Sequence, residues 1–318
     1  MTVSSAAELK MGKATRDAFG EALRDIGKSD KRIVVVDGDV NNSTRTEWFA
    51  KEAPDRFFNM GIAESNMVGV AAGLAACGKV PFVASFAVFL WANAFDQLRM
   101  GVAFPHLNVK IVGSHAGISI GEDGPSQMGI EDVGLALSLP GVDVLVPCDE
   151  AQTRAAVKLM VEHDGPIYLR CGRSGVPIVY PDGCDLQLGK AIQLRDGDDV
   201  ALMANGLMVA EALRAADALA AEGIRARVLD MASVRPIDEG AIEAAARETR
   251  GIVVAEEHLV QTGLGSVVAR VVAERHPAPI RFVGLHTYAE SGPGKALLEK
   301  YGLTGEKIVE AARTLPNR

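Results

Sequence analysis

Glu64 is a carboxylate whose sequence surroundings allow two roles. A short apolar segment, 57–59, leads through Gly61 into a stretch of small residues, 68–77, and Glu64 lies at the corner between them. An acid in the first turn of a helix is favoured by the helix dipole, and such residues are common. An acid buried in apolar surroundings can instead hold a proton for catalysis. Position alone leaves both interpretations open.

His115, Glu122 and Asp123 form a second group with chemical potential. They lie in the glycine-rich stretch 113–132, which directly follows an apolar segment. Loops of this length are usually functional or disordered. Hydrophobic residues scattered through this one disfavour disorder, so the stretch is a candidate binding or catalytic loop.

Aromatic residues are concentrated in one short segment. Only 5% of the chain is aromatic, yet Phe82, Phe86, Phe89 and Trp91 all fall between positions 82 and 91. Phe86 and Phe89 are three residues apart, so they can share one face of a helix. Core packing is the common role of such a pair, and a flat platform for a heterocycle is the functional alternative.

Composition excludes several classes of protein. A chain of 318 residues with 48% hydrophobic content is long enough for two domains with sizeable cores. Its net charge of -8 argues against non-specific nucleic-acid binding, which needs a basic face. The apolar runs are shorter than a membrane span, and residues 1–13 lack the apolar core of a secretory signal. The four cysteines show no metal-ligand spacing, which is typical of reduced thiols in a cytoplasmic protein.

Apolar, β-branched runs alternate with helical periodicity along the chain. This predicts an α/β fold of two consecutive domains, each a mainly parallel sheet flanked by helices. The expected strands are 32–37, 57–59, 80–84, 109–113, 142–146, 166–169, 200–204, 226–230, 251–255 and 280–283. The expected helices are 14–28 (with Gly27 near its C-cap), 68–77, 92–103, 131–139, 150–162, 208–222, 236–249 and 264–275.

A stretch rich in glycine and proline, 172–198, interrupts this alternation. We therefore expect domains at 1–180 and 198–318, joined by a linker at 181–197 with some extended structure. Ligands of open α/β sheets bind beyond the carboxyl ends of the strands. The polar segments 37–43 and 113–132, which follow strands, are the places to look for a site.

Three motifs together resemble the pyrimidine-binding domain of the transketolase family. They are Met60-Gly61-Ile62-Ala63-Glu64-Ser65-Asn66-Met67, Ser85-Phe86-Ala87-Val88-Phe89 and Gly121-Glu122-Asp123-Gly124-Pro125-Ser126. Segments 169–170, 233–238 and 297–303 resemble the start of that family's linker and its C-terminal domain. The resemblance spans essentially the whole chain. It implies transfer of a two-carbon ketol unit from a ketose phosphate to an aldose phosphate, with thiamine diphosphate as cofactor.

The resemblance also implies a partner. Full-length transketolases carry a further N-terminal domain that holds the cofactor's diphosphate and its divalent metal. This chain is similar to the C-terminal subunit of a split transketolase, so we expect a separate N-terminal transketolase subunit and an α2β2 heterotetramer. The Mg²⁺ ligands are then expected on the partner. Asp37-Gly38-Asp39 followed at once by Asn41-Asn42 lacks the spacing of the family's metal motif. The small-residue segment 69–76 is expected at a subunit interface, with dense packing inside the subunit as the alternative.

Cofactor contacts follow from the same resemblance. Glu64 matches the glutamate that hydrogen-bonds N1′ of the aminopyrimidine and so promotes removal of the thiazolium C2 proton. Phe86 and Phe89 match the aromatic wall around that ring. The third wall position falls at Ala92, so the stacking is expected to be either incomplete or helped by Trp91. Asp39 matches an acid near the cofactor.

Substrate contacts are implied as well. Arg16, Ser43, His115 and Arg170 match the family's sugar-phosphate anchors. Two arginines, a hydroxyl and an imidazole suit a phosphate dianion. His115 is also a candidate for a catalytic role, and Asp123 matches the acid that contacts a substrate hydroxyl.

Gln127 departs from the family pattern, because most transketolases have a histidine there. A glutamine can hydrogen-bond but cannot carry a proton in the same way. This substitution favours an unusual donor, such as a branched ketose phosphate, or slower turnover.

Three other functions share the expected fold. Deoxyxylulose-phosphate synthase has a similar loop around Asp123 but is normally a single chain. The β subunit of a 2-oxo acid dehydrogenase has a matching glutamate, but the phosphate anchors and the loop around Asp123 speak against it. A non-catalytic regulatory subunit is disfavoured because Glu64, His115 and Asp123 are all retained. In the second domain, 256–258 (Glu-Glu-His) follows a strand, and a structural or interface role is expected there.

Overall fold

The computed structural model describes Ala6 and residues 9–316. Its strands are β1 (Met11–Ala14), β2 (Ile33–Asp37), β3 (Phe57–Asn59), β4 (Val80–Phe86), β5 (Lys110–Ser114), β6 (Asp143–Leu145), β7 (Ile167–Arg170), β8 (Gly175–Pro177), β9 (Ile192–Arg195), β10 (Val200–Ala204), β11 (Ala226–Asp230), β12 (Ser233–Arg235), β13 (Ile252–Leu259) and β14 (Ile280–Leu285). Its helices are α1 (Thr15–Ser29), α2 (Asn41–Thr44), α3 (Glu47–Glu52), α4 (Glu64–Ala76), α5 (Ala87–Asn93), α6 (Phe95–Gln97), α7 (Asp132–Ser138), α8 (Glu150–Glu162), α9 (Met208–Ala221), α10 (Glu239–Glu248), α11 (Leu264–Arg275), α12 (Gly294–Lys300) and α13 (Gly305–Arg313), with shorter turns η2 (Pro54–Arg56), the π-helical η3 (Leu98–Ala103) and η4 (Ile118–Ile120).

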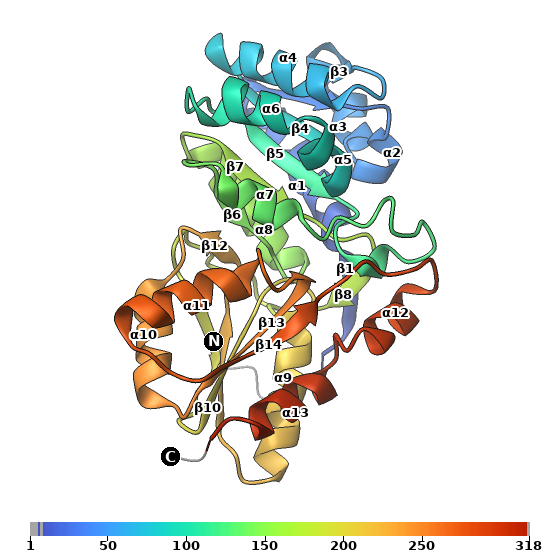
Figure 1. Cartoon of the computed structure of the whole chain (residues 1–318). Coiled ribbons are helices and arrows are strands. Elements are labelled where there is room, and N and C mark those ends of the chain that lie inside the picture. Colours follow the sequence, from blue (N-terminus) through green and yellow to red (C-terminus); the bar gives the residue numbers. More distant parts are fainter. Residues whose placement is uncertain (1–5, 7–8, 317–318) are drawn as a thin grey trace.

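The first sheet has seven strands in the order β12-β6-β7-β5-β4-β2-β3, and all but β12 run parallel. Helices cover both of its faces, so its central strands are mostly apolar. Phe19 of α1 and Val157 of α8 pack on the face that includes Val35. Met67 of α4 and Trp91 of α5 pack on the opposite face. Figure 1 shows this unit in blue to green.

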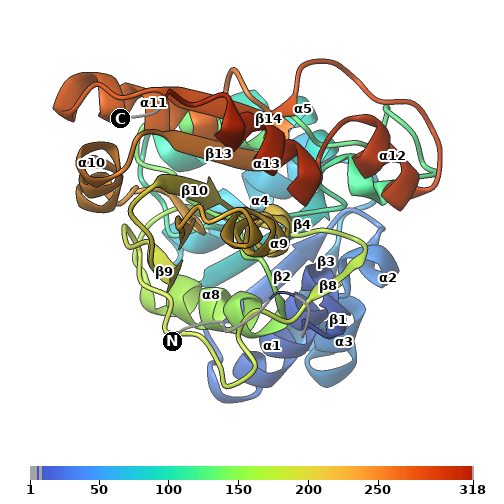
Figure 2. The ribbon, with the colours of Figure 1, turned by 90° about the horizontal axis from the view of Figure 1, so that it is seen from below.

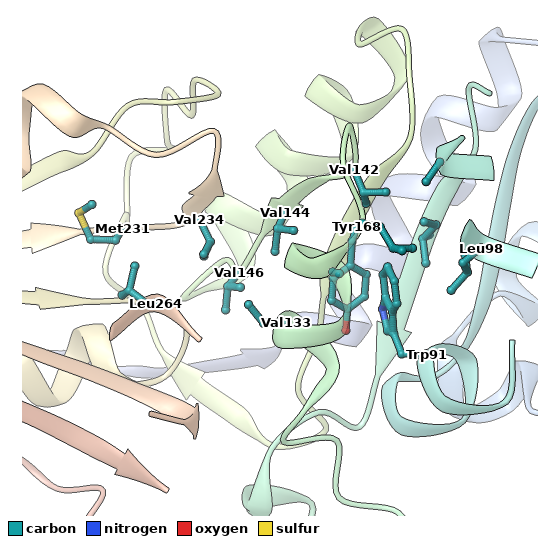
Figure 3. Close-up of a cluster of buried hydrophobic side chains, with 14 of the residues drawn as sticks. Trp91, Leu98, Val133, Val142, Val144, Val146, Tyr168, Met231, Val234 and Leu264 are labelled. Atoms are coloured by element: carbon teal, nitrogen blue, oxygen red, sulfur yellow. The ribbon is translucent and has the colours of Figure 1, made fainter. Parts of the chain in front are cut away.

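The second sheet has the order β14-β13-β10-β11-β9, with β9 as an antiparallel edge strand. The two sheets share a core. One cluster of buried apolar side chains runs from Leu98 through Val133 and Val146 to Met231 and Leu264, as Figure 3 shows. The two mainly parallel, helix-flanked sheets confirm the expected α/β architecture, and the core between them is continuous.

Several elements differ from expectation. Strand β1 was not expected; it pairs with β8, which together with β9 of the second sheet supplies the extended structure expected in 172–198. Gly27 lies inside α1, where a Cβ would come within 2.4 Å of the Phe49 ring, and the helix ends instead at Ser29. The expected helix 92–103 begins earlier, at Ala87, and is interrupted at Ala94. No helix in the described part of the chain has the length and apolarity needed to cross a bilayer.

Candidate active site

Strands β2, β4, β5 and β7 are parallel neighbours, so their carboxyl ends meet at one edge of the first sheet. The residues that directly follow these strands therefore face a common region. They include Asp39, Phe89, His115 and Arg173. The sequence predicted the candidate site at this edge.

Glu64 is both a first-turn residue and a buried acid. It begins α4, and its side chain is only 7% exposed. Asn93 at the end of α5 donates its side-chain amide to Oε2 of Glu64 at 3.4 Å. Ser65 in turn donates its hydroxyl to the Asn93 carbonyl at 2.7 Å. The carboxyl group therefore has one long hydrogen bond and can accept a stronger partner.

Asp37 shapes the loop that carries Asp39. Its fully buried carboxylate accepts hydrogen bonds from the Val40 amide at 2.9 Å and from the hydroxyls of Thr44 and Thr46 at 2.7 Å each. Burial raises the pKa of Asp37, although these three bonds lower it. Asp39 follows with a φ of 63° and accepts a 2.7 Å hydrogen bond from the side chain of Asn59. Asp39 thus lies beside the strand that leads to Glu64.

Phe86 and Phe89 form a flat aromatic surface, as their spacing predicts. Their rings are stacked, with centroids 5.9 Å apart and planes 14° apart. The His115 ring stacks on Phe86 at 3.9 Å. Trp91 points the other way and lies edge-on to Tyr168 in the core (Figure 3). The expectation that Trp91 extends the aromatic wall is therefore wrong. Two residues beyond Phe89, it falls on the opposite face of α5.

His115 is a neutral imidazole with a defined tautomer. Its Nε2 is 3.1 Å from Nη1 of Arg16, and its Nδ1 is 2.9 Å from the Ser114 hydroxyl. A guanidinium can only donate, so Nε2 accepts and the proton resides on Nδ1. Burial, reinforced by the positive charges of Arg16, Arg173 and Arg45, lowers the pKa of His115 to about 3.

Arginines surround this imidazole. Arg16, in the first turn of α1, also donates to the Ser43 carbonyl at 3.0 Å. Burial and the nearby Arg45 lower the pKa of Arg16. Its buried Nε has no hydrogen-bond partner among the described residues. A buried donor without a partner calls for an explanation, and next to other cations an anionic ligand supplies one.

Arg170 does not belong to this cluster. Its side chain is buried at 7% exposure, and Nε donates to Asp132 at 2.8 Å. Nη2 donates to the carbonyls of Gly129 and Glu257. Burial lowers the pKa of Arg170, but Asp132 and Glu257 raise it more, so it stands above its ordinary value. Arg170 is committed to internal contacts, which contradicts its expected role as a phosphate anchor.

Arg173 and Arg45 are the residues that sequence reasoning missed. Arg173 lies three residues beyond the end of β7 and donates to the Ile120 carbonyl at 2.8 Å. Arg45, in the segment after β2, is paired with Asp17 at 2.6 Å. Both lie beyond the carboxyl end of a strand, whereas Arg170 lies within one. Applying the strand-end rule to arginines would have selected them.

Two of the remaining candidates, Asp123 and Gln127, lie in the loop 113–132, and the third, Ser43, lies in α2. Asp123 is exposed, and its charge acts on Arg16. Gln127 is half-buried, and its side-chain oxygen accepts a 2.5 Å hydrogen bond from the Ser126 hydroxyl. Ser43 is held next to Arg16 through its backbone carbonyl. Within residues 9–316 and Ala6, no group of three or more His, Cys, Asp or Glu side chains could hold a metal ion.

Comparison with known proteins decides the family. The model described as "Transketolase, pyrimidine binding domain" matches residues 11–178, and "Transketolase, C-terminal domain" matches residues 189–308. The chain belongs to the transketolase family. Family membership implies thiamine diphosphate as cofactor.

Three relatives illustrate the similarity. The chain is 42% identical, over 95% of its length and 94% of the other's, to 6-deoxy-6-sulfo-D-fructose transketolase subunit SqwH of Clostridium sp. strain MSTE9. It is 40% identical to human transketolase, covering 95% of this chain but 49% of that one. A solved structure titled "Split gene transketolase, inactive beta4 tetramer" is 49% identical, with a TM-score of 0.88 over 96% of this chain and 98% of that one.

The residues present fit one end of thiamine diphosphate. Glu64 provides a buried carboxyl group with capacity for a nitrogen partner. The Phe86–Phe89 pair provides a flat apolar surface for an aromatic ring. These are the groups that an aminopyrimidine requires. The described residues offer no corresponding cluster for a divalent metal.

Proposed function

We propose that this chain is the C-terminal subunit of a thiamine diphosphate-dependent transketolase. With a separate N-terminal subunit, it transfers a two-carbon ketol unit from a ketose phosphate to an aldose phosphate. The supporting observation is that groups suited to two tasks lie around α5 and the strand end before it. The buried Glu64 is hydrogen-bonded by Asn93 at the end of α5, while His115, 3.1 Å from Arg16, stacks on Phe86 at the start of α5. Cofactor activation and anion binding thus meet at one sheet edge.

Bound thiamine diphosphate would supply the electron sink needed to break the C2–C3 bond of the ketose. Glu64 would share a proton with N1′ of the aminopyrimidine, which makes the opposite amino nitrogen basic. Phe86 and Phe89 would hold the ring flat, and Asp39 would lie nearby. The diphosphate and Mg²⁺ would be held by the partner subunit.

The arginine cluster would bind the far end of the sugar. Arg16, with Arg173 taking the role expected of Arg170, provides donors for a tetrahedral oxyanion, and His115 orients Arg16 through Nε2. A terminal phosphate and a terminal sulfonate share this chemistry. The name of the Clostridium relative specifies a sulfonated sugar, so both anions need testing. The Ser43 hydroxyl would contribute a further donor, Asp123 would accept from a substrate hydroxyl, and Gln127 would contact the donor.

The partner would dock on the face formed by α4 and the turns beside it. Gly69 and Gly73 of α4 have open space where a Cβ would project. Large apolar side chains lie exposed in adjoining segments, with Ile62 at 81% and Phe104 at 80%. η3 packs against α4, so these residues share one side of the first unit. Exposed apolar residues grouped in this way mark interaction surfaces. We expect this face to carry the contacts of an α2β2 heterotetramer.

The deciding experiment mixes the chain with an N-terminal transketolase subunit, thiamine diphosphate and Mg²⁺. The readout is release of glyceraldehyde 3-phosphate from xylulose 5-phosphate with ribose 5-phosphate as acceptor. Glu64→Gln should lower kcat by about 10²- to 10⁴-fold, as expected for loss of a proton-transferring group. Glu47→Gln, at the matching first-turn position of α3, is the control and should be fully active. A parallel arm with 6-deoxy-6-sulfofructose tests the sulfonate.

Other outcomes identify the alternatives. Activity from this chain alone would remove the need for a partner. Complex formation without turnover of any ketose phosphate or sulfonate would favour a regulatory subunit. Decarboxylation of a 2-oxo acid by the complex would favour the dehydrogenase β subunit.

A further inference from the structure

The glycine-rich loop 113–132 is held by the second half of the chain. The Ser119 amide donates to Oε1 of Glu257 at 2.6 Å, and the Leu259 amide donates to the Ile130 carbonyl at 3.2 Å. The Ser291 hydroxyl donates to the Glu122 carbonyl at 2.5 Å. Figures 1 and 2 both show α12 beside this loop, and α12 packs against η4. The loop with His115 at its start and Gln127 near its end is therefore fixed from β13 and the β14–α12 connection.

Glu257 is at the centre of these contacts. Its side chain is 5% exposed, and its carboxyl group fills the space beside Gly117. A Cβ on Gly117 would lie 2.1 Å from Cδ of Glu257, and the φ of 83° at Gly117 also favours glycine. Arg170 links the Glu257 carbonyl to the Gly129 carbonyl, with Nη2 distances of 3.0 and 2.9 Å. One short segment of β13 thus reaches both ends of the loop.

We propose that Glu257 is a positioning residue for the substrate-binding loop. Its carboxyl group fixes the turn 117–120, which sets where His115 lies on one side and Asp123 and Gln127 lie on the other. The second domain, expected to have only a structural or interface role at 256–258, thereby takes part in substrate binding. The link to substrate rests on the proposed function, whereas the hold on the loop does not.

A cavity gives experimental access to this contact. It has a volume of about 340 Å³ and lies between the two halves of the chain. Glu257, Arg170 and Ser119 line it together with apolar residues such as Val176 and Leu298. A small carboxylate can therefore reach the Ser119 amide when the Glu257 side chain is removed.

Glu256 provides a matched control. It is the preceding residue of β13 and equally buried, but it accepts hydrogen bonds from the amides of Leu264 and Gly265 at 2.7 Å each. Those contacts cap the N-terminus of α11, a helix that flanks the second sheet. Glu256→Ala should therefore lower the melting temperature without loosening the loop, while Glu257→Ala should do both.

The first measurement is hydrogen exchange of the free chain. In Glu257→Ala, the amides of 117–131 should exchange about tenfold faster, because a buried hydrogen bond is lost. Adding acetate or formate should restore protection, and Glu257→Gln, which keeps an acceptor oxygen, should resemble the wild type. If Glu257→Ala does not fold, Glu257→Asp withdraws the acceptor by one methylene and should loosen the loop. Equal exchange in the Glu256→Ala and Glu257→Ala chains, or no rescue by acetate, overturns the proposal.

The second measurement uses the assembled complex. Glu257→Ala should raise KM for the ketose phosphate about tenfold and leave the affinity for thiamine diphosphate unchanged, because Glu64 and Phe86 are untouched. An unchanged KM overturns the substrate role. Should the complex have no transketolase activity at all, the exchange and acetate results still decide whether Glu257 holds the loop.

Discussion

Two clusters of ionisable side chains are built on opposite principles. Arg16, Arg45 and Arg173 gather around the neutral His115, and the acids beside them, Asp17 and Glu122, are partly exposed. Arg170 instead lies in a buried network with Asp132 and its neighbours, where the charges compensate one another. Burial raises the pKa of Asp132, but Arg170 and His258 lower it more, so that the carboxyl stays charged.

The difference distinguishes arginines that are available to bind a ligand from arginines that stabilise the fold. A buried charge that has its counter-charge in the chain stabilises one arrangement of the backbone, and removing it leaves the partner unpaired. A cation without a full set of partners contributes little to folding and is available to a ligand. Loss of stability and loss of substrate affinity should therefore fall on different arginines.

Arg170→Met should produce the largest effect. It leaves Asp132 buried without its cation, which costs about 3 to 5 kcal/mol of unfolding free energy. Arg173→Met is the matched control three residues on, and its unfolding free energy should change by about 0.5 kcal/mol or less. Urea unfolding monitored by circular dichroism measures both. Comparable losses in the two variants would abolish the distinction between the clusters.

Much of this architecture could be predicted, because alternating periodicity is a local signal. Strand β11, helix α8 and helix α11 have the bounds that the sequence predicted. β12 could not be assigned, since its partner is set by tertiary contacts. Arg235 of β12 donates to the carbonyls of Ala136, Leu137 and Leu139 at the end of α7, which ties this strand from the second half to the first sheet.

Site residues were predictable where a motif coincided with a strand end. Glu64, Phe86 and His115 each stand at such a place, and the structure brings them to one edge. Arg170 and Arg173 are both arginines in one short segment, so residue type does not separate them. Their positions relative to the end of β7 do separate them, and burial, with Arg170 inside and Arg173 at the rim, agrees with that distinction.

Arg16→Met should have the second-largest effect, and it should change substrate affinity where Arg170→Met changes stability. KM for a phosphorylated ketose should rise about 10²-fold, or about 2 to 3 kcal/mol, because a charge-assisted contact is lost. KM for an unphosphorylated ketose should not change. Arg32→Met removes an exposed arginine paired with Asp30 and serves as control for net charge. An equal rise in KM for both sugars would place the anion elsewhere.

His115→Asn should change how stability depends on pH. The pKa of His115 is about 3 in the folded chain and 6.5 when unfolded, so between these values the unfolded chain binds a proton that the folded chain does not. Stability contributed by the neutral imidazole is present above pH 6.5 and falls as pH is lowered. Between pH 7.5 and pH 4.5, the unfolding free energy of His115→Asn should therefore fall by about 2.7 kcal/mol less than that of the wild type. Urea unfolding at both values tests this, with the exposed His286→Asn as control.

Ser43→Ala should have the smallest effect. Its size distinguishes a role of the Ser43 hydroxyl in binding the anion from a role of the Ser43 carbonyl in holding Arg16. Arg16 is held by the Ser43 carbonyl, not by its hydroxyl, so the variant keeps the arginine in place. Only the hydroxyl's own hydrogen bond to the anion is lost, which is worth about 1 kcal/mol, or about a fivefold rise in KM for the phosphorylated ketose. A rise as large as that of Arg16→Met would mean that the hydroxyl orders the whole cluster. No rise would leave Ser43 as a backbone support, with anion binding carried by the arginines alone.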